Sequence, residues 1–399
     1  MSLRIKDLPR IPDYVQGMTD HQYLQAAWKN GPLALDRYGF VTAFPARLMQ
    51  EFMDDRWTRQ IEMEGMYASG VTSGPMYDFV GNVMLFSNGD VHRRRRGPLA
   101  RTFAHKLIAN LRDDVAARCE RLIASLVGKG EVDFLASVAG PLPAEVIGAM
   151  LGVPDADMPD FARHVYSAIR GLSLVSPEVR AESDADMAYL LDRVGGLIET
   201  RRDTPDGGIV SYYLDRVTGG DLSEMEILSQ MVGLVVAGSD TTRGALTATV
   251  SQLLQNPAQW ALLKEDPEKW VSGTVSEGLR FDPVIGSIGR ITVERHEIEG
   301  VSIPPDTLIS ASMLTALRDP DIYTDPDHFD ISRDDHPRLH PVFGGGPHRC
   351  LGEALARIEL EEALKAVARM APDMALVGEP ARLRGYGAVR TVSAFTVRM

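Results

Sequence analysis

The chain has 399 residues, a length that suggests about two or three domains. Its content of 44% hydrophobic and 24% charged residues is typical of a globular protein. A formal net charge of −13 argues against nucleic acid as the main partner, because phosphate backbones attract basic surfaces. With only two cysteines, no apolar leader and no apolar run of the roughly 18 residues that a membrane span needs, we expect a soluble cytoplasmic protein without a membrane anchor.

The N-terminal part shows short, mixed patterns. Prolines interrupt residues 1–37, which we expect to form a lead-in segment packed on the main domain. Residues 38–44 read as a strand of a small sheet. Residues 65–90 are rich in Gly, Ser, Met and aromatic residues, so we expect a long loop that lines a pocket or, alternatively, a poorly ordered surface loop.

Four consecutive arginines follow this loop. His92 and Arg96 share one face of a helix because they are four residues apart, whereas the arginines between them point elsewhere. Arg101 and Lys106 extend the basic cluster. Its simplest interpretation is a solvated basic face. Alternatively, one face holds a buried anion and the other attracts an acidic partner.

The middle of the chain is predicted to be helical. Residues 105–215 are mainly helical, with one helix between Pro141 and Gly152, and Cys119 is expected to be a small buried hydrophobe. The longest predicted helix covers residues 223–255. Ser223 and Glu226 form a capping box at its start, and Asn256-Pro257 ends it.

Polar residues gather in the middle of this long helix, in Ala237-Gly238-Ser239-Asp240-Thr241-Thr242. The helix is otherwise apolar enough to be buried nearly all round, and a buried carboxylate is costly unless it is paired or used. Thr241 can bond back to the carbonyl one turn earlier. From this segment alone, a structural polar pair and a functional site are equally good interpretations of Asp240.

The next helix is predicted from Pro267 to near Pro283. It carries Glu277 and Arg280, an i, i+3 ion pair that indicates no function when taken alone. Strands are expected around residues 289–293 and 308–311, and an irregular stretch covers 318–342. Residues 389–399 alternate like a strand.

The most distinctive stretch runs from Phe343 to Gly352. Three glycines and a proline predict a tight turn, and a helical pattern follows directly after Cys350. A cysteine at a helix N-terminus favours the thiolate over the thiol, because amide N–H groups and the helix dipole stabilise negative charge there. Such a thiolate suits a nucleophile or a metal ligand.

In their order along the chain, four motifs resemble those of the bacterial cytochromes P-450, which are haem-thiolate monooxygenases. The resemblance rests on these segments: Phe343-Gly344-x-Gly346-x-His348-x-Cys350-x-Gly352 for the cysteine loop, Glu277-x-x-Arg280 for the ion pair, Ala237-Gly238-x-Asp240-Thr241-Thr242 for oxygen activation, and His92-x-x-x-Arg96 for the haem-carboxylate helix. It spans residue 38 to the C-terminus. It implies one domain, residues 1–399, with the cytochrome P-450 fold: a triangular prism of helices around a buried haem, mainly α with a small β region.

The resemblance also implies a role for each motif residue. Cys350 would be the axial thiolate ligand of the iron in haem b, and Phe343 would shield that side of the haem. The propionates would be held by His92, Arg96, Arg290 and His348. Asp240 and Thr241 would relay protons during oxygen activation. A structural ion-pair network would join Glu277, Arg280 and Arg333. Ile288 lies where some relatives carry a polar propionate contact.

We expect a substrate pocket that is lined by the 65–90 loop and by Val236, Ala237, Ile285 and Gly286. These residues are mostly apolar, so we expect a hydrophobic small molecule as substrate. Gly233 and Gly286 lack side chains where relatives carry larger ones, which suggests room for a terpenoid or a polycyclic compound.

The activity implied by the resemblance is hydroxylation with O2. The chain leaves no room for a flavin or ferredoxin domain, so we expect an external [2Fe-2S] ferredoxin and its NAD(P)H-dependent reductase to supply electrons to a monomer. A basic docking face would consist of Arg93, Arg94, Arg101 and Arg349. One alternative is a haem-thiolate peroxygenase or isomerase, which needs no proton relay, so that the Asp240-Thr241 pair argues against it. Another is a non-catalytic haem-binding sensor.

Overall fold

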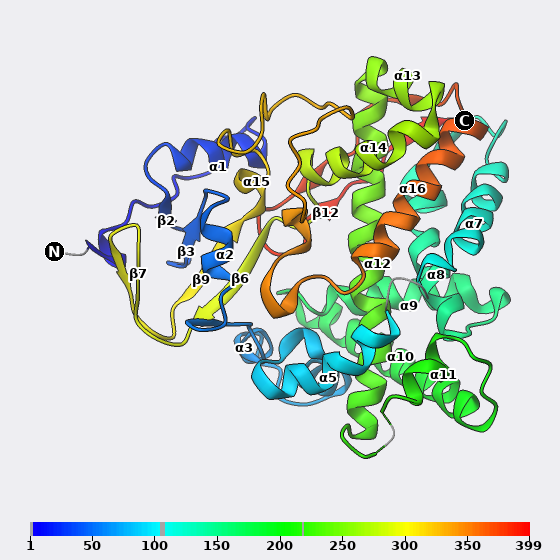
Figure 1. Ribbon diagram of the computed structural model, residues 1–399, viewed down its shortest axis with the longest axis horizontal. Helices are drawn as coiled ribbons and strands as arrows, with labels where there is room; N and C mark the ends of the chain where they lie inside the picture. Colours follow the sequence, from blue (N-terminus) through cyan, green and yellow to red (C-terminus); the bar gives the residue numbers. More distant parts are fainter. Residues whose placement is uncertain (1–2, 104–107, 218) are drawn as a thin grey trace. The chain divides into compact units, whose positions relative to one another are not determined.

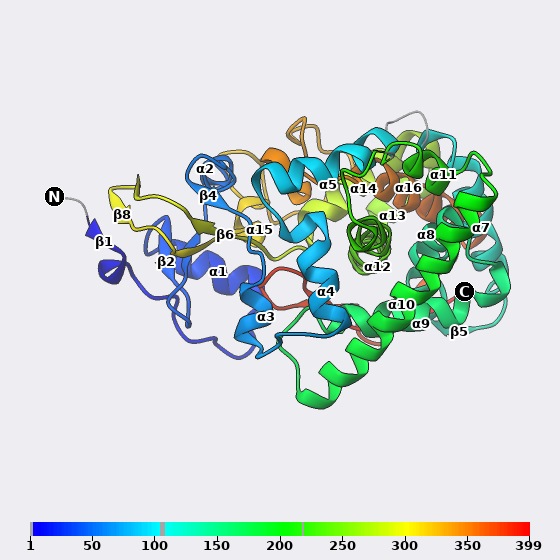
Figure 2. The same ribbon diagram turned by 90° about the horizontal axis from the view of Figure 1, so that it is seen from below.

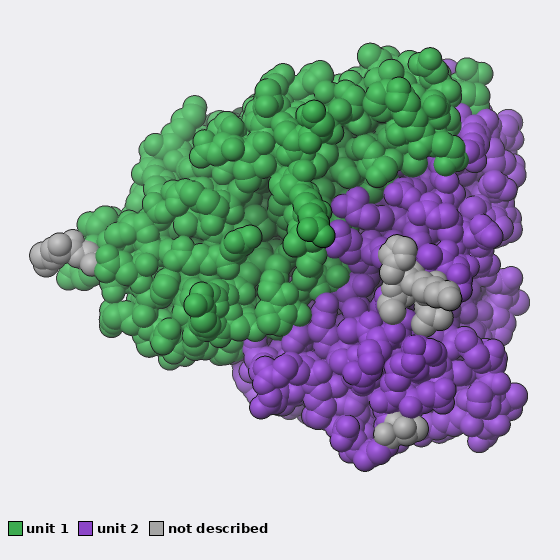
Figure 3. All heavy atoms as spheres, in the orientation of Figure 1, with its two compact units in different colours: residues 1–60, 244–350, 372–396 green, residues 61–243, 351–371, 397–399 purple. Residues whose placement is uncertain are grey.

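The computed structural model describes residues 3–103, 108–217 and 219–399 (Figures 1 and 2). It is 54% helical with a small β region, so the predicted fold class is confirmed. The chain divides into two compact units, coloured green and purple in Figure 3. Unit 1 comprises residues 1–60, 244–350 and 372–396, and unit 2 comprises residues 61–243, 351–371 and 397–399. The expectation of a single domain stays a prediction, and Lys106 of the predicted basic cluster lies outside the described residues.

Unit 1 contains a five-stranded sheet with the strand order β2-β3-β9-β6-β4. Its strands are β2 (Leu33–Leu35), β3 (Val41–Ala43), β4 (Thr58–Arg59), β6 (Ser287–Thr292) and β9 (Leu308–Ser312). Only the β3–β9 pair is parallel. The short strand β4 pairs with β6 so that Thr58 lies opposite Thr292. This pairing brings the chain around residue 58 beside Arg290.

Unit 1 also contains helices and further short strands. The helices are α1 (Asp20–Trp28), α2 (Leu48–Phe52), α13 (Pro257–Glu265), α14 (Pro267–Phe281) and α15 (Met313–Ala316). A second sheet has the order β1-β8-β7, and β11 pairs with β12. The other strands are β1 (Leu3–Arg4), β7 (His296–Ile298), β8 (Val301–Ile303), β10 (Ala375–Val377), β11 (Leu383–Arg384) and β12 (Thr391–Val392).

Unit 2 is mainly helical. Its α-helices are α3 (Glu64–Ala68), α4 (Pro75–Asn82), α5 (Gly89–Thr102), α7 (Arg112–Ala124), α8 (Pro141–Leu151), α9 (Met158–Arg170), α10 (Pro177–Asp203), α11 (Ile209–Leu214) and α16 (Glu353–Met370). The strand β5 (Glu131–Asp133) and a π-helical turn over residues 135–139 precede α8. Helix α9 packs along α10, and α7 packs along α16. Cys119 is buried, as predicted.

Two elements have residues in both units. Helix α12 (Glu224–Gln255) crosses from unit 2 to unit 1 after Arg243, and strand β13 (Thr396–Arg398) also spans the division. The start of α12 carries the predicted capping box: the Ser223 amide donates to Glu226 (2.9 Å), and the Glu226 amide donates to the Ser223 hydroxyl (3.2 Å). Among the described residues, no helix combines the length and apolar character needed to cross a membrane.

The prediction of a long loop over residues 65–90 is wrong. Helix α4 begins after Gly74 with a proline in its first turn, a position where a missing N–H costs nothing. Met76, Phe79 and Val80 are buried and follow the spacing of one helix face. Five glycines and a proline in this stretch are typical of a loop and obscure its short apolar pattern.

Two other boundaries differ from the predictions. The strand predicted over residues 38–44 is limited to Val41–Ala43, because residues up to 40 belong to a turn in which Gly39 has a φ of 86°. The helix after the cysteine begins at Glu353 with Gly352 as its N-cap, so Cys350 lies in the preceding loop. The C-terminal alternation is divided between β12 and β13.

Candidate active site

In unit 1, the cysteine loop folds back on itself through hydrogen bonds to its own backbone carbonyls. The Cys350 amide donates to the Phe343 carbonyl (2.9 Å), and the Arg349 guanidinium donates to the Gly344 carbonyl (2.8 Å). His348 lies in the short turn over Gly346–His348. Cys350 is exposed, in contrast to the buried Cys119. The loop therefore presents an accessible thiol on a backbone that is held by internal hydrogen bonds.

Glycine is required at two positions of this loop. Gly344 has a φ of 71° and Gly346 a φ of 59°, which L-residues rarely adopt. A Cβ atom at Gly346 would also lie 2.8 Å from the carbonyl oxygen of Met53. The backbone thus approaches its neighbour too closely for any larger residue. The sequence prediction of a tight, glycine-dependent turn is confirmed here.

Arg290 lies on β6 and belongs to the same part of unit 1. Ile288 and Arg290 point to one face of the strand because side chains alternate along it. The Ile288 side chain reaches the cysteine loop, since its Cδ1 atom lies 3.5 Å from the position of a Cβ on Gly344. Arg290 therefore faces the side of the sheet on which the cysteine loop lies.

The buried Arg290 guanidinium is surrounded by acceptors from the segment around β4. Its Nε donates to the Thr58 hydroxyl (3.2 Å), its Nη1 to the Gln60 side chain (3.4 Å), and its Nη2 to the Asp55 carboxylate. Burial lowers the pKa of the Arg290 guanidinium, whereas Asp55 raises it. These three neighbours were not predicted, because a strand of two residues leaves no readable pattern.

Glu277 and Arg280 form an ion pair that is entirely without solvent exposure. Two bonds of 2.7 and 2.8 Å join their side chains, and the Arg333 Nε lies 3.3 Å from the same carboxylate. Backbone carbonyls accept the remaining Arg280 bonds, from residues 317, 326 and 328. The three residues predicted as a network are thus brought together in unit 1.

In unit 2, α5 is fastened to the start of α12 by Glu226. Its carboxylate accepts hydrogen bonds from Arg94 (2.6 and 2.8 Å) and from the buried Arg95 (2.9 Å). Arg94 is the main cause that lowers the pKa of Glu226 to about 2. His92 is buried and Arg96 half-buried, one turn apart on this helix. Glu226 therefore fixes both the cap of α12 and the helix that carries these two residues.

The middle of α12 has an accessible strip on an otherwise well-buried helix. Ala237 is exposed, and Asp240 and Thr241 are half-buried. The Thr241 hydroxyl donates to the Ala237 carbonyl (3.0 Å), as predicted. Asp240 forms an ion pair with Arg243, whose guanidinium lies 4.1 Å from the centre of the Tyr166 ring. The carboxylate is thus both paired and within reach of water.

The residues predicted to line the substrate pocket differ in exposure. Ala237 lies on the accessible strip, whereas Val236 is buried. Gly286 is also buried, against the backbone of residues 386 and 387. Ile285 packs against an apolar cluster in unit 1 that includes Ala248 and Leu383. Of the four residues, only Ala237 is exposed in the structure.

The expectation of extra room at Gly233 and Gly286 is wrong. A Cβ at Gly233 would lie 2.7 Å from a methyl group of Val83. A Cβ at Gly286 would lie 2.4 Å from the carbonyl oxygen of Gly387. Neighbouring atoms already occupy the space that a side chain would take, so these glycines permit close packing and do not enlarge a pocket.

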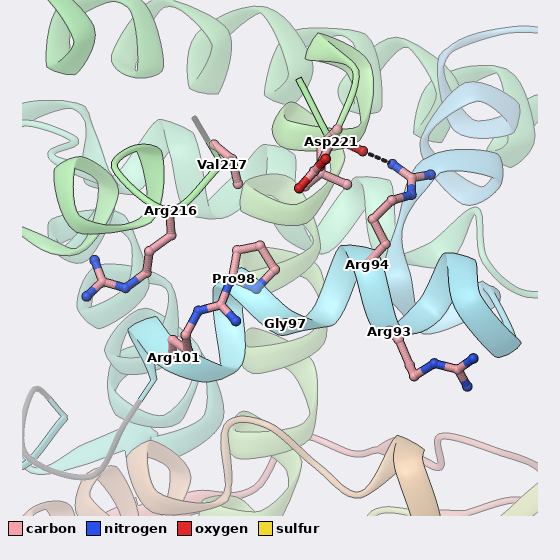
Figure 4. A pocket seen from close by; sticks show the side chains of 9 residues that line it. Arg93, Arg94, Gly97, Pro98, Arg101, Arg216, Val217 and Asp221 are labelled. Atoms are coloured by element: carbon pink, nitrogen blue, oxygen red, sulfur yellow. Dashed lines mark hydrogen bonds between the residues drawn. The ribbon is translucent and has the colours of Figure 1, made fainter. Parts of the chain in front are cut away.

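The basic cluster is partly used within unit 2. Arg94 is bound to Glu226, and Arg93 forms an exposed ion pair with Asp90. A pocket of about 210 Å³ lies beside α5. Four arginines line it, together with Asp221 and apolar residues: Arg93, Arg94, Arg101 and Arg216 (Figure 4). Of the residues predicted for docking, Arg94 and the loop residue Arg349 thus have structural partners, and the docking face itself stays a prediction.

The described side chains suit a haem in three respects. The exposed thiol of Cys350 on a glycine loop is the donor that haem iron takes in thiolate proteins. Arg290 is a buried cation, which a carboxylate can neutralise. The exposed Ala237 on α12 is a small apolar side chain, which a flat apolar ligand can approach closely.

Comparisons with known proteins agree with these features. The family model for Cytochrome P450 matches residues 188–369. The chain is 38% identical over 350 residues to Cytochrome P450-pinF1, plant-inducible, of Rhizobium radiobacter, covering 86% of this chain and 82% of that protein. Luteothin monooxygenase of Streptomyces thioluteus is 32% identical, covering 78% of this chain and 76% of that protein.

Solved structures of the same family share the fold. The structure of CalO2 has a TM-score of 0.86 at 26% identity, over 94% of this chain and 95% of that chain. The cytochrome P450 enzyme CxnD has a TM-score of 0.85 at 26% identity, over 98% of this chain and 97% of that chain. Together with a relative of 38% identity over most of the chain, these matches show that the chain belongs to the cytochrome P450 family and is a monooxygenase with haem as its cofactor.

Proposed function

We propose that the enzyme hydroxylates a small hydrophobic organic substrate, with electrons from a ferredoxin and its NAD(P)H-dependent reductase. The observation that carries the proposal is the accessible acid–alcohol step on α12, formed by Asp240 and Thr241. A monooxygenase needs protons when O2 is cleaved, whereas a peroxygenase or an isomerase needs no such relay.

The haem would be held by one iron ligand and by four residues that bind its propionates. Cys350 is proposed as the axial ligand, and the propionates are proposed to bind His92, Arg96, Arg290 and His348. When bound, haem with a thiolate ligand supplies the oxygen chemistry that attacks an unactivated C–H bond. Phe343, which begins the loop, is proposed to shield the thiolate side. Glu277, Arg280 and Arg333 are proposed to have a structural and not a catalytic role.

Proton transfer is proposed to run from solvent through Asp240 to Thr241. The Asp240 side chain is 19% exposed, so it can exchange protons with water. The Arg243 guanidinium forms an ion pair with the Asp240 carboxylate, because Asp240 and Arg243 lie one turn apart on the helix. This ion pair holds the carboxylate at the edge of the helix. The Thr241 hydroxyl is anchored on the Ala237 carbonyl and keeps its oxygen lone pairs available as acceptors. Water would connect the two side chains.

Replacing Thr241 by Ala tests the relay. We expect Thr241→Ala to divert most of the electrons from NAD(P)H to hydrogen peroxide, because the proposed proton relay is interrupted. Product and peroxide formed per NAD(P)H are measured. Thr249→Ala is the control, since Thr249 makes the same type of bond, to the Ala245 carbonyl (2.8 Å), two turns further along the helix. Equal product yield in the wild-type enzyme and Thr241→Ala would favour a peroxide-driven enzyme.

The proposed electron donor is an acidic [2Fe-2S] ferredoxin. Its support is the group of arginines around the pocket beside α5 on a chain with a net charge of −13. Arg93 and Arg101 are exposed, and the ion pair of Arg93 with Asp90 lies at the surface, so both arginines are proposed for docking. Arg94 is not suitable for the test, because it fastens α5 to α12.

Charge reversal tests this docking proposal. We expect the double variant Arg93→Glu/Arg101→Glu to slow reduction by ferredoxin by about tenfold or more at low salt, with a weaker salt dependence than the wild type. Stopped-flow reduction at several ionic strengths measures both quantities. Arg163→Glu changes the charge of an exposed residue on α9 and serves as the control. Unchanged rate and salt dependence in the double variant would refute the docking face.

The substrate is proposed to be hydrophobic because the accessible strip on α12 includes Ala237 and the nearby Leu234 is half-buried. Among the relatives, one is named as a steroid C26-monooxygenase of Mycobacterium tuberculosis and another as luteothin monooxygenase. A compound panel scored by the shift of the Soret band identifies binders. Binding of charged hydrophilic compounds in preference to apolar ones would contradict the proposal.

A further inference from the structure

Arg290, one of the proposed haem-binding residues, is already bound by a carboxylate of the protein. Its guanidinium is nearly inaccessible, with a side chain that is 3% exposed, whereas the Asp55 side chain is 37% exposed. The partner is thus a carboxylate at the surface that reaches a cation in the interior. An arginine buried without any counter-charge would be costly, so this contact stabilises the position of Arg290.

The geometry of the guanidinium leaves capacity for a second carboxylate. An arginine side chain has five N–H donors in a planar fork. Thr58, Gln60 and Asp55 accept one bond each from Nε, Nη1 and Nη2. Two N–H groups are left over in this count, one on each terminal nitrogen, which is the pair that a carboxylate takes in bidentate recognition.

The chain order explains why Asp55 meets Arg290. Helix α2 ends at Phe52, and β4 pairs antiparallel with β6 so that Arg59 lies opposite Ile291. The turn between α2 and β4 therefore runs past the Arg290 side chain. Neighbouring Asp54 in the same turn binds Arg56 at the surface instead (2.8 Å). Only one of two consecutive aspartates thus reaches the buried cation.

We propose that Asp55 is a positioning residue that divides the charge of Arg290 between itself and a haem propionate, and that it thereby sets the reduction potential and the retention of the haem. The inference rests on the proposed role of Arg290. A second negative group on the same guanidinium weakens its attraction for the propionate, because the two carboxylates share one positive charge. The negative charge of Asp55 also raises the energy of the reduced haem, because it repels the added electron.

The Asp55→Asn variant tests this inference in the holoenzyme. Asn keeps an acceptor for Nη2 but removes the negative charge. At a fixed applied potential we expect the ratio of reduced to oxidised haem to rise by roughly threefold to tenfold, and a tenfold change corresponds to about 59 mV for one electron. Transfer of haem to an excess of a haem-scavenging apoprotein should slow by about threefold or more. Spectroelectrochemistry and absorbance kinetics measure the two quantities.

Asp54→Asn is the matched control, because it makes the same change of net charge one residue away, on a carboxylate that pairs with Arg56. Both quantities should stay near their wild-type values in this variant. Asp55→Asn in an Arg290→Gln background should also have little effect, since Asp55 is expected to act through Arg290.

The outcomes separate this inference from the proposed role of Arg290. If Arg290→Gln accelerates haem loss but Asp55→Asn behaves like Asp54→Asn in both measurements, the inference about Asp55 is refuted and Arg290 keeps its role. If Arg290→Gln leaves haem transfer unchanged, the assignment of Arg290 fails and the inference fails with it. A lower potential in Asp55→Asn would also overturn the inference.

Discussion

At the scale of single residues, one carboxylate carries much of the organisation around α14. Glu277 has no solvent exposure and contacts Arg280 and Arg333, and its Oε1 also accepts a bond from the Asp330 amide (2.8 Å). Burying three charged groups is favourable only while their partners stay in place, because each would otherwise lack the solvation that it had in water. The network is therefore expected to be sensitive to the loss of Glu277, the carboxylate that Arg280 and Arg333 share.

Glu277→Gln removes the negative charge that Arg280 and Arg333 share, and among the described residues Arg333 keeps only its ion pair with Asp335 (3.2 Å). We expect the free energy of unfolding to fall by about 3–5 kcal/mol, the range found when one partner of a buried ion pair is removed. Chemical unfolding followed by circular dichroism measures the change, and the yield of haem-loaded protein should fall with it. Glu379→Gln breaks an exposed pair with Arg382 and is the control, with an expected change below about 1 kcal/mol. A similarly small effect at Glu277 would contradict this view of the network.

Residue types with a fixed chemistry were predictable from the sequence, whereas their partners were not. The glycines of the cysteine loop and the back-bond of Thr241 follow from local stereochemistry. The pairing of Arg290 with Asp55 joins residues 235 positions apart and depends on strand pairing. The presumed space at Gly286 was misjudged for the same reason, because the atoms that fill it come from residue 387.

At the scale of elements, α1 is held in unit 1 by a buried histidine. The His21 ring contacts the Leu314 carbonyl on α15 (3.1 Å) and the Asp282 carboxylate after α14 (3.4 Å). Burial is the largest cause that lowers the pKa of His21 to about 4, and the nearby Arg318 adds to it. His21 is therefore neutral in the folded protein at neutral pH.

This lowered pKa predicts a loss of stability in acid. The unfolded chain binds a proton at His21 below a pKa of about 6.5, while the folded chain does so only near 4, so stability decreases as the pH falls between these values. At pH 5, protonation of His21 in the unfolded chain lowers the free energy of unfolding by about 2 kcal/mol relative to neutral pH. Guanidinium unfolding at several pH values should show a smaller decrease in His21→Gln than in the wild type. The exposed His328→Gln is the control, and equal pH dependence in all three proteins would refute the prediction.

Long elements with clear end signals were the most predictable part of the fold. The capping box and Asn256-Pro257 define α12 almost to the residue, and its length leaves little ambiguity. Strands such as β4 and β11 have two residues each, too few for a period of two to show. Helix α4 was missed because turn-forming residues outweighed its short apolar pattern.

At the scale of the whole molecule, the length prior pointed to two or three domains, and the four motifs pointed to the cytochrome P450 fold, which the solved structures confirm. Composition alone contained none of this information. The net charge of −13 excluded a general basic character but not a local one, as the arginines around the pocket beside α5 demonstrate. Function at this scale follows from family membership, and the roles of individual residues follow from chemistry that can be tested.

Cys350 is proposed as the ligand of the haem iron, and the absorbance of the reduced, CO-bound protein is the most direct test of this assignment. We expect a band at about 450 nm in the wild type, which a thiolate ligand produces, and loss of that band in Cys350→Ser and Cys350→His. Cys119→Ala, which changes the buried second cysteine, should keep the band. A band that persists in haem-loaded Cys350→Ser, or that disappears in Cys119→Ala instead, would contradict the account.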